Sequence, residues 1–410
     1  MSKKVGVIIP IYNAAELLGE CLDSVCNQSY MDFEVLLVDD GSTDERVQTI
    51  IQNYTQKDSR FSTIKIANSG QAVARNLGIE HFVKNNRVDY IIFLDSDDTL
   101  EPECIGELVE SIGSADLVWY DFRYIFRSVK PHNELTIMEK YGFKARQMIT
   151  ARQWLEESAK AGLNAFACGC WAMISVEYLN RINLRFLDAH GEDNHFGIML
   201  FIQANQIQIL PKKLYNYMIR QDSTINYGGK SSVQSTPIRL RKYLKDFYYN
   251  PMMLQKYYRA GGAAVMLGDI VSKFRDDRQI YELLELTFLN RLCMLGLNLK
   301  NFPSDPFEYN KYLPLVQEYA RAHSIGAFAL VHSSTAYWIG SSVIATKSSL
   351  KALLNVPKYI YKIIKDRRYT KEVKFDLESF WDKDYAQKVL KHRSYKIGKV
   401  ILNLLSKKEK

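Results

Sequence analysis

The strongest constraint on the fold is an alternation of short apolar runs with amphipathic stretches through residues 5–98. Helical periodicity occupies Leu17–Asn27, Asp44–Lys57 and Ala72–Val83, and the apolar runs around them are "VGVIIP", "FEVLLVDD", "STIKIA" and "VDYIIFLDSDD". Because parallel strands need crossover helices, this alternation predicts a parallel sheet with helices on both faces. Ligands of such sheets bind beyond the carboxyl ends of the strands, so the motifs at those ends indicate function.

The chain has 410 residues, more than one hydrophobic core usually organises, and its pattern changes along its length. Beyond residue 100 we expect one or two strands in "ADLVWYDFRYIF", helices near Ala151–Ala161 and Asp193–Ala204, and a closing strand in "IQILPKKLYNYMIR". Long Leu-, Tyr- and Met-rich helical segments follow. We therefore predict an α/β domain over residues 1–235, a helical domain over 236–346 and a basic amphipathic region over 347–410.

The positive charge is concentrated near one end of the chain. The formal net charge is +8, and the segment from Lys391 to Lys410 carries seven Lys or Arg residues against one Glu. A concentrated positive segment indicates an anionic surface as partner. No stacking aromatic is interleaved with it beyond Tyr395, so a nucleic acid is not expected.

The cysteines and the first residues indicate a cytoplasmic protein. None of the six cysteines has zinc-site spacing, which favours reduced, structural thiols. "MSKKVGVIIPIYN" predicts a first strand instead of a signal peptide, since its apolar run is short and reaches a proline. The uncharged stretch Ser324–Thr346 is interrupted by Ser, Thr and His, so a buried helix is favoured over a membrane span.

The ends of the first two strands predict a shaped, acidic edge. No G-x-G-x-x-G or P-loop follows the first strand; Pro10, Tyr12 and Asn13 stand there instead. Asp39 and Asp40 follow the second strand, and a carboxylate there can accept the imide or amide hydrogen of a nucleobase. Gly41 permits a tight turn with positive φ, and Ser42 or Thr43 would cap the helix beginning near Asp44. The alternative is that both aspartates only cap the helix.

The end of the fourth strand predicts a cation site. Asp95, Asp97 and Asp98 follow a fully apolar strand, and so much negative charge at the ligand end of a sheet is costly without a cation. Hard oxygen ligands in a D-x-D pattern suit Mg²⁺ or Mn²⁺, held partly by protein and partly by substrate phosphates. The alternative is an acidic turn that caps the helix after Pro102.

Three further segments supply candidate site residues. In "NSGQAVARNLGI", Gly70 allows close approach and Arg75 offers a forked contact to phosphate or to the acidic cluster, unless it is an ordinary surface arginine. "HGEDNHF" places Glu192 and Asp193 at the start of a helix, as a general base or as a cap. "RQDSTIN" adds Arg220 with the hydroxyls of Ser223 and Thr224, in a loop suited to closing on a diphosphate.

Together these motifs closely resemble the inverting nucleotide-sugar glycosyltransferases of family 2. "PIYN", "VDDGSTD", "NSGQAVARNLGI", "FLDSDD", "GCWAMIS" and "GEDNHF" occur in the order and spacing of that family, over about residues 4–226. The resemblance implies a GT-A fold, which is a Rossmann-like α/β domain, binding a nucleoside-diphosphate sugar that is commonly linked to UDP. It does not extend to the helical domain.

The resemblance also implies roles for individual residues. Pro10 and Asp40 would line the uracil pocket with Asp39 nearby, Asp97 or Asp98 would be the direct metal ligand, and Asp193 would be the catalytic base. The remaining nucleotide-sugar contacts are expected from Tyr12, Asn13, Gly70, Arg75, Asp95, Ser96 and Asp97. Contacts to the acceptor or the diphosphate are expected from Trp171, Glu192, Arg220 and Ser223.

The implied activity is metal-dependent, inverting transfer of a hexose or N-acetylhexosamine from a UDP-sugar to a hydroxyl of a glycan acceptor, with Mn²⁺ or Mg²⁺ as cofactor. We expect an acceptor in bacterial lipooligosaccharide, lipopolysaccharide or capsule synthesis. A polyprenyl-phosphate-linked or protein-linked glycan is the alternative, and a catalytically silent sugar-nucleotide-binding subunit is a third hypothesis. The chain shows neither the membrane spans nor the Gln-x-x-Arg-Trp motif of processive synthases, which favours transfer of one or few sugars.

The basic end of the chain predicts an interfacial helix. Ile397, Val400, Ile401, Leu404 and Leu405 share one helical face, and Lys396, Lys399 and Lys407 lie on another. "SYKIGKVIL" also resembles the ends of bacterial lipopolysaccharide glycosyltransferases. We therefore expect a cytoplasmic protein peripherally bound to the anionic inner face of the cell membrane, with a helix docked on its own protein as the alternative. The helical domain would also support a homo-oligomer.

Overall fold

The structure is a computed structural model that describes residues 3–85, 87–131, 134–168, 170–220, 236–325 and 382–406. The chain divides into two compact units. The first comprises Met1–Asp188 and Glu192–Asn226, and the second comprises Ala189–Gly191 and Tyr227–Lys410. Three residues just before Glu192 thus belong to the second unit, which no feature of the sequence indicated.

The first unit contains the predicted parallel sheet. Its strands β1 (Val5–Ile11), β2 (Phe33–Asp39), β3 (Phe61–Lys65) and β4 (Tyr90–Phe93) lie in the order β3-β2-β1-β4, and all three pairings are parallel. β1 is buried along its whole length, as expected for a strand covered on both faces. The parallel sheet predicted from residues 5–98 is therefore confirmed.

The other half of the sheet is mixed, not parallel. β8 (Ala172–Ser175) pairs antiparallel with β4 and with β6 (Leu117–Phe126), so it separates β6 from the parallel half. β9 (Ile207–Ile219), the predicted closing strand, pairs parallel with β6 and antiparallel with β5 (Thr99–Leu100) and β7 (Gln147–Ile149). "ADLVWYDFRYIF" forms one strand, not two. β8 was not predicted because four residues carry too little periodicity.

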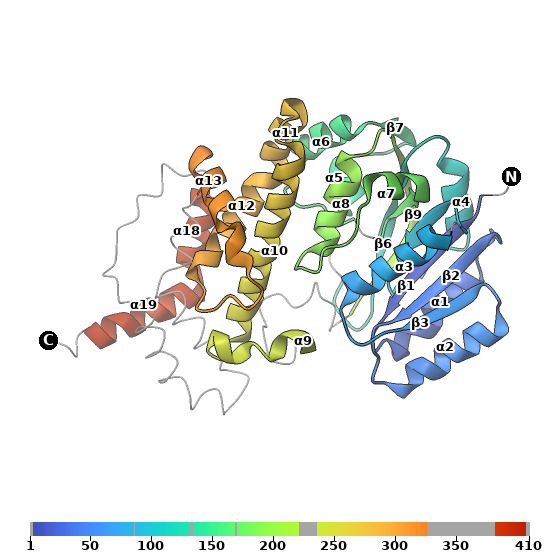
Figure 1. The fold of residues 1–410 in the computed structure, drawn as a ribbon, viewed down its shortest axis with the longest axis horizontal. Helices are drawn as coiled ribbons and strands as arrows, with labels where there is room; N and C mark the ends of the chain where they lie inside the picture. The colour runs from blue at the N-terminus through green and yellow to red at the C-terminus, as the bar shows by residue number, and fades with distance from the viewer. Residues whose placement is uncertain are drawn as a thin grey trace. The chain divides into compact units, whose positions relative to one another are not determined.

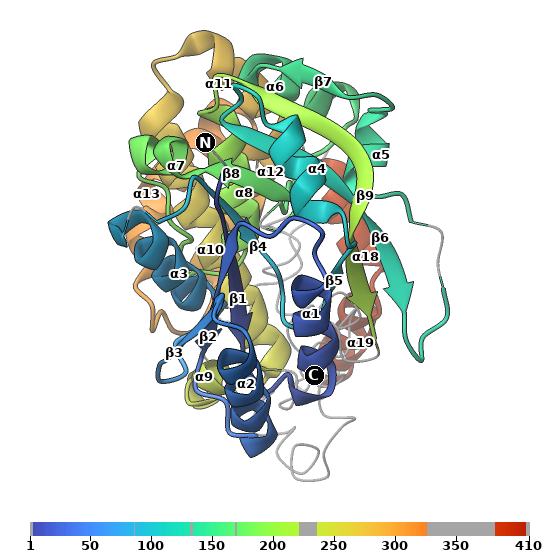
Figure 2. The ribbon, with the colours of Figure 1, turned by 90° about the vertical axis from the view of Figure 1, so that its right-hand side faces the viewer.

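Helices cover both faces of this sheet, and Figure 2 shows α3 and α1 on opposite sides of β1. The bounds of the helices in the first unit are α1 Ala15–Cys26, α2 Glu45–Lys57, α3 Gln71–Asn85, α4 Cys104–Ser111, α5 Ile137–Tyr141, α6 Ala151–Lys160, α7 Val176–Ile182 and α8 Glu192–Ile202. The six cysteines are all unpaired thiols, as predicted.

The α3–β1 contact depends on a glycine, which gives a stability prediction. A Cβ at Gly78 would lie 2.4 Å from Cγ2 of Ile8, a buried residue of β1, so Gly78→Ala requires the core to shift. We expect a loss of about 1–3 kcal/mol in the free energy of unfolding. Gly19→Ala is the matched control, because a Cβ at Gly19 in α1 meets nothing within 4 Å. It should stabilise by about 0.5–1 kcal/mol through helix propensity. Urea unfolding monitored by circular dichroism measures both, and equal signs would contradict the packing argument.

The second unit is helical over its described residues, as predicted. Figure 1 shows α10 (Pro251–Phe274) as its longest helix. The other elements are α9 Ile238–Arg241, η2 Leu244–Phe247, α11 Arg278–Leu284, the π-helix η3 Glu285–Leu289, α12 Asn290–Gly296, η4 Leu297–Asn301, η5 Tyr309–Tyr312, α13 Leu313–Ala322, α18 Lys383–Lys391 and α19 Arg393–Ser406.

None of the described helices is long and apolar enough to span a bilayer. Most of the uncharged stretch Ser324–Thr346 lies outside the described residues, so its predicted burial stays a prediction. The segment predicted as an interfacial helix is helical, as α19, and its binding to a membrane stays a prediction. Within it Lys396 and Lys399 are exposed, and Val400 is 58% exposed.

Candidate active site

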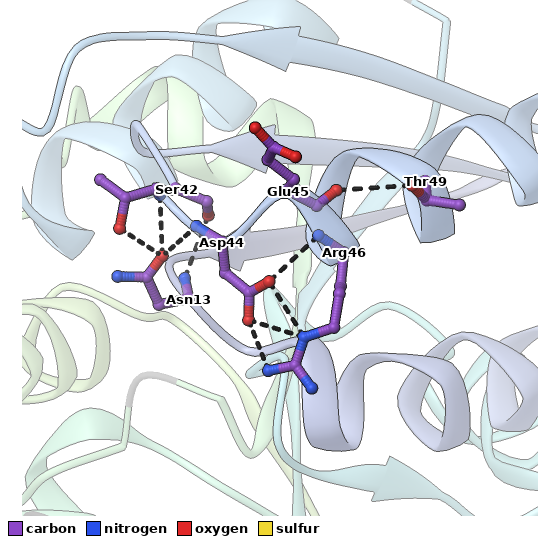
Figure 3. A network of polar contacts seen from close by, with 7 residues as sticks. Asn13, Ser42, Asp44, Glu45, Arg46 and Thr49 are labelled. Atoms are coloured by element: carbon purple, nitrogen blue, oxygen red, sulfur yellow. Dashed lines mark hydrogen bonds and ion pairs between the residues drawn. The ribbon is translucent and has the colours of Figure 1, made fainter.

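Asn13 organises the loop that follows β2. Its backbone has φ of 51°, and its amide oxygen Oδ1 accepts hydrogen bonds from the backbone N–H of Thr43 (2.8 Å) and of Asp44 (3.2 Å). Its own N–H donates to Ser42 Oγ at 3.0 Å, and Figure 3 shows the network. Asp44, not Ser42 or Thr43, caps α2, because its side chain accepts from the N–H of Arg46. The sequence prediction of the cap was therefore wrong by one or two residues.

Asp39 and Asp40 are both buried, and their carboxylates accept hydrogen bonds from backbone N–H groups. Asp39 Oδ1 accepts from the N–H of Ser42 at 2.9 Å, and its Oδ2 accepts from Gln48 Nε2 at 2.5 Å. Asp40 accepts from the N–H of Ser69 at 2.6 Å and of Gly70 at 2.8 Å. The two carboxylates thus fix the loops that precede α2 and α3. Their predicted contact with a nucleobase stays a prediction.

Two glycines permit these loops. Gly41 has φ of 72°, which confirms the predicted positive value, and Gly70 has φ of 99°. A Cβ at Gly41 would also lie 2.7 Å from the backbone nitrogen of Asn68. Pro10 lies within the buried strand β1, whereas Tyr12, just beyond the end of β1, is exposed. Asn13 is exposed as well, so Tyr12 and Asn13 are the accessible members of the predicted pocket edge.

Arg75 is a buried arginine of the site, not a surface residue of α3. It is 3% exposed, and its Nη2 donates to Asp95 Oδ1 at 2.6 Å. Gln71 Nε2 donates to the same oxygen at 3.0 Å, and Cys170 Sγ lies 3.6 Å from Nη2. The Nε of Arg75 is buried without a partner among the described residues. Arg75 thus fixes the carboxylate of Asp95, the first of the acidic turn Asp95–Asp98. Its Nε can still donate a hydrogen bond.

The acidic turn after β4 places its three carboxylates in different environments. The N–H of Asp98 donates to the carbonyl of Asp95 at 3.0 Å, and the turn carries Ser96 half-buried between them. Asp97 Oδ2 accepts from Arg220 Nη2 at 2.6 Å. Asp98 is 0% exposed, and its two oxygens accept from Tyr215 OH (2.6 Å) and the N–H of Met218 (2.7 Å).

The three carboxylates repel one another. Burial raises the pKa of Asp98 well above its usual range, and the charges of Asp97 and Asp95 raise it further. Burial also raises the pKa of Asp97, with Asp95 adding to the effect and Arg220 opposing it. A cation at this turn would relieve that repulsion, so the charge of the donor set fits a bound metal.

The geometry favours Asp97 over Asp98 as the direct metal ligand. Both oxygens of Asp98 already accept hydrogen bonds inside the core, whereas among the described residues Asp97 accepts a side-chain hydrogen bond from Arg220 through Oδ2 alone. In the part of the chain that the structure describes, no three His, Cys, Asp or Glu side chains are grouped to hold a metal ion. The residues therefore fit a Mg²⁺ or Mn²⁺ ion that takes one or two carboxylates and completes its shell with substrate phosphates and water.

Glu192 and Asp193 begin α8, as predicted, and the positive charge of Arg75 acts on the carboxylate of Asp193. Burial raises the pKa of Asp193, and the positive charge of Arg75 opposes that rise. Asp193 Oδ1 accepts from the N–H of Asn194 at 2.8 Å. Arg75 therefore interacts electrostatically with both the acidic turn and the candidate base.

Aromatic side chains beside the acidic turn were mostly missed at the level of sequence. Trp171 stacks on Phe122, with ring centroids 4.0 Å apart, and meets Tyr217 edge-on at 6.0 Å. Tyr215 and Tyr217 alternate along β9, and that period of two on a strand was an available signal that they share a face. Ser223 and Thr224 lie outside the described residues, so the predicted diphosphate loop is represented by Arg220 alone.

Comparisons with known proteins show to which chains this one is similar. The family model described as "Glycosyl transferase family 2" matches residues 6–182. The glycosyltransferase GlyG of Streptococcus pneumoniae is 34% identical over 229 residues, which cover 54% of this chain and 73% of GlyG. The uncharacterized glycosyltransferase EpsJ of Bacillus subtilis is 27% identical over 323 residues, covering 77% of this chain and 83% of EpsJ.

A solved structure has a similar fold. The crystal structure of S. aureus TarS residues 1–349 in complex with UDP-GlcNAc superposes with a TM-score of 0.51, covering 92% of this chain and 94% of that one. The identity is 16%, so this likeness concerns the fold alone.

Proposed function

This chain belongs to glycosyltransferase family 2, and from that premise we propose that it transfers a hexose or an N-acetylhexosamine from a UDP-sugar to a hydroxyl of a glycan acceptor, with inversion at the anomeric carbon. It is an enzyme that takes its sugar from a nucleotide sugar. The identity of the nucleotide, the inversion and the roles of individual residues are part of the proposal.

One observation carries the proposal: Arg75 interacts with both the acidic turn and Asp193, the candidate base. It pairs with Asp95 at 2.6 Å and lowers the pKa of Asp193 from a value raised by burial. A carboxylate that binds a donor and a carboxylate that removes a proton must work within the length of one sugar. A shared buried arginine supports that closeness.

In the proposed reaction Asp193 accepts the proton of the acceptor hydroxyl while that oxygen attacks the anomeric carbon. The bond from that carbon to the diphosphate oxygen breaks on the opposite face, and UDP leaves with the electron pair. Arg220 lies beside Asp97 and would contribute positive charge to the leaving diphosphate. Trp171, stacked on Phe122, offers an aromatic edge for a sugar ring.

A divalent cation would be held by Asp97, with Asp95 as the neighbouring carboxylate. When bound, Mn²⁺ or Mg²⁺ would neutralise charge on the departing diphosphate. Asp98 would support the turn from within the core, since both its oxygens are engaged there. Asp97 and Asp95 would thus contact the ion, and Asp98 would hold the turn in position.

We place the acceptor in a bacterial lipooligosaccharide, lipopolysaccharide or capsule. The exposed Lys396, Lys399 and Val400 of α19 support attachment to the anionic inner face of the cell membrane, where lipid-linked acceptors are extended. A polyprenyl-phosphate-linked or protein-linked glycan is the alternative acceptor. Lys407 lies outside the described residues, and a homo-oligomer stays a prediction.

The experiment that tests the proposal measures UDP release from a panel of nucleotide sugars with Mn²⁺, Mg²⁺ or EDTA. We expect hydrolysis of one UDP-sugar that EDTA abolishes. Binding without turnover would be expected for an enzyme that lacks its acceptor. Failure to bind any nucleotide sugar would contradict both the proposal and the hypothesis of a silent sugar-nucleotide-binding subunit.

The pH dependence of activity tests the role of Arg75. Arg75→Gln removes the charge that lowers the pKa of Asp193, so that pKa rises and the base is protonated up to a higher pH. We expect the acid limb of the kcat/KM profile to shift to higher pH. Arg46→Gln is the control, because Arg46 is 67% exposed and pairs with Asp44 on α2. An unshifted limb in a variant with unchanged thermal stability would exclude Arg75 as a positioning residue for Asp193.

A further inference from the structure

The hydroxyl of Tyr215 bridges the two ends of the acidic turn Asp95–Asp98. It accepts a hydrogen bond from the backbone N–H of Asp95 at 3.2 Å, and it donates to Asp98 Oδ2 at 2.6 Å. A backbone bond from the N–H of Asp98 to the carbonyl of Asp95, 3.0 Å long, closes the same turn. Tyr215 thus joins the first and the last residue of the turn from a separate strand, β9.

The position of Tyr215 is fixed by strands on both of its sides. Tyr215 pairs with Leu100 of β5, the strand that directly follows the turn, and with Phe122 of β6. The residue is 0% exposed, so its ring is enclosed by the core of the first unit. The hydroxyl is therefore attached to a rigid part of the sheet, and its two hydrogen bonds hold the turn against that part.

A bulge in β9 sets the direction of the Tyr215 side chain. From Leu210 to Tyr215 the strand β9 takes five residue steps, whereas β6 takes two from Tyr120 to Phe122. Because successive side chains of a strand point to opposite faces, an odd excess of residues exchanges the faces of the side chains that follow. Bulges next to active sites commonly re-aim a side chain in this way. The bulge is therefore part of what aims Tyr215 at the turn.

Asp97, the candidate metal ligand, lies between the two residues that Tyr215 joins. Asp97 is half-buried, whereas Asp98 is 0% exposed. Mg²⁺ requires near-ideal octahedral geometry, so a carboxylate that binds it must be held in one position. Residues that orient a metal ligand without touching the ion commonly change the metal affinity about 10–100-fold when they are removed. A bridge across the acidic turn has the location for such a role.

We propose that Tyr215 is a positioning residue of the cation site, which orients Asp97 toward the ion by holding Asp95 and Asp98. This role rests on the proposed function, because it takes the acidic turn as the place where the cation binds. The hydroxyl of Tyr215 is engaged with both ends of the turn, so it acts through the turn and not on the ion itself. Loss of the hydroxyl should therefore weaken the binding of the metal and leave metal-free binding of the nucleotide unchanged.

Calorimetric titration of the full chain with UDP over a series of Mn²⁺ concentrations tests this role without any turnover. Tyr215→Phe keeps the ring and loses both hydrogen bonds. In this variant the Mn²⁺ concentration that half-strengthens UDP binding should rise about tenfold, with little change at zero or saturating Mn²⁺. Tyr178→Phe is the matched control, because Tyr178 is 1% exposed and its hydroxyl donates to the carbonyl of Leu200, outside the acidic turn. Both variants should be less heat-stable than the wild type, but the control should keep the Mn²⁺ dependence of the wild type.

The possible outcomes separate this role from the proposed function. An unshifted Mn²⁺ dependence in Tyr215→Phe would show that the turn keeps its geometry without the hydroxyl, and it would overturn the positioning role alone. An equal shift in Tyr178→Phe would reduce the effect to general destabilisation and would overturn that role as well. If Mn²⁺ does not strengthen UDP binding even in the wild type, the acidic turn is not a cation site, and the metal dependence of the proposed function fails together with the role of Tyr215.

Discussion

Replacing Asp193 with Asn should reduce sugar transfer about 10³-fold while leaving binding of the nucleotide sugar unchanged. The variant keeps the size and the position of the side chain at the start of α8 but cannot take up a proton. A positioned general base contributes about 10²–10⁴ to the rate. Steady-state release of UDP in the presence of acceptor measures the rate, and calorimetry with the intact donor measures the binding.

The neighbouring carboxylate supplies the control for this variant. Glu192 is half-buried like Asp193 and directly precedes it, so Glu192→Gln changes the local charge by the same amount. We expect Glu192→Gln to retain most of the rate if Asp193 is the base. A loss of the same size in Glu192→Gln with little loss in Asp193→Asn would transfer the role to Glu192. Similar small losses in both variants would show that the base lies elsewhere.

The parallel half of the fold was predictable because each of its elements has a strong local pattern. The apolar run that forms β1 is buried at every position, and α1, α2 and α3 each lie where the helical periodicity placed them. Burial on both faces of a central strand imposes such a pattern on the sequence. The antiparallel insertion of β8 between β4 and β6 left no such signal, since a short strand takes its direction from tertiary contacts.

The sequence motifs predicted the positions of the site residues correctly. They predicted the contacts of the individual side chains less well. Asp40 was correctly expected at the end of β2, yet its carboxylate faces the backbone N–H groups of Ser69 and Gly70. Asp98 was correctly placed in the acidic turn, yet Tyr215 and Met218 of β9 occupy both its oxygens. These partners lie far away along the chain, so the hydrogen bonds depend on the register of the folded sheet.

The helical unit illustrates the opposite limit. Its helices were predicted from composition and periodicity, but nothing in the sequence paired Gly262 with His190 or Arg259 with His190. A glycine inside a helix ordinarily lowers its stability, so Gly262 within a helical pattern was a signal that could have indicated a close packing contact. The partner of such a contact can be identified only in the folded structure.

Replacing Asp97 with Asn should make donor binding insensitive to the metal and reduce kcat/KM for the donor about 10²–10³-fold. Among the described residues Asp97 accepts a side-chain hydrogen bond only at Oδ2, from Arg220 at 2.6 Å, which favours Oδ1 as the atom that contacts the metal. An asparagine can still accept that hydrogen bond, so the position of Arg220 is kept, but a neutral amide oxygen is a much weaker ligand for a hard cation. The size of the loss corresponds to removal of electrostatic stabilisation from the departing diphosphate.

Calorimetric titration with UDP, with and without Mn²⁺, separates this role from a structural one. In the wild type Mn²⁺ should strengthen UDP binding, and in Asp97→Asn it should not, although binding without the metal should be similar in both. Asp276→Asn is the control for a loss of negative charge, because that side chain is 97% exposed in the helical unit. If Mn²⁺ strengthens UDP binding equally in Asp97→Asn and the wild type, Asp97 does not contact the ion. The metal would then have to be held by Asp95, by Asp98, which requires its bonds to Tyr215 and Met218 to open, or by residues outside this turn.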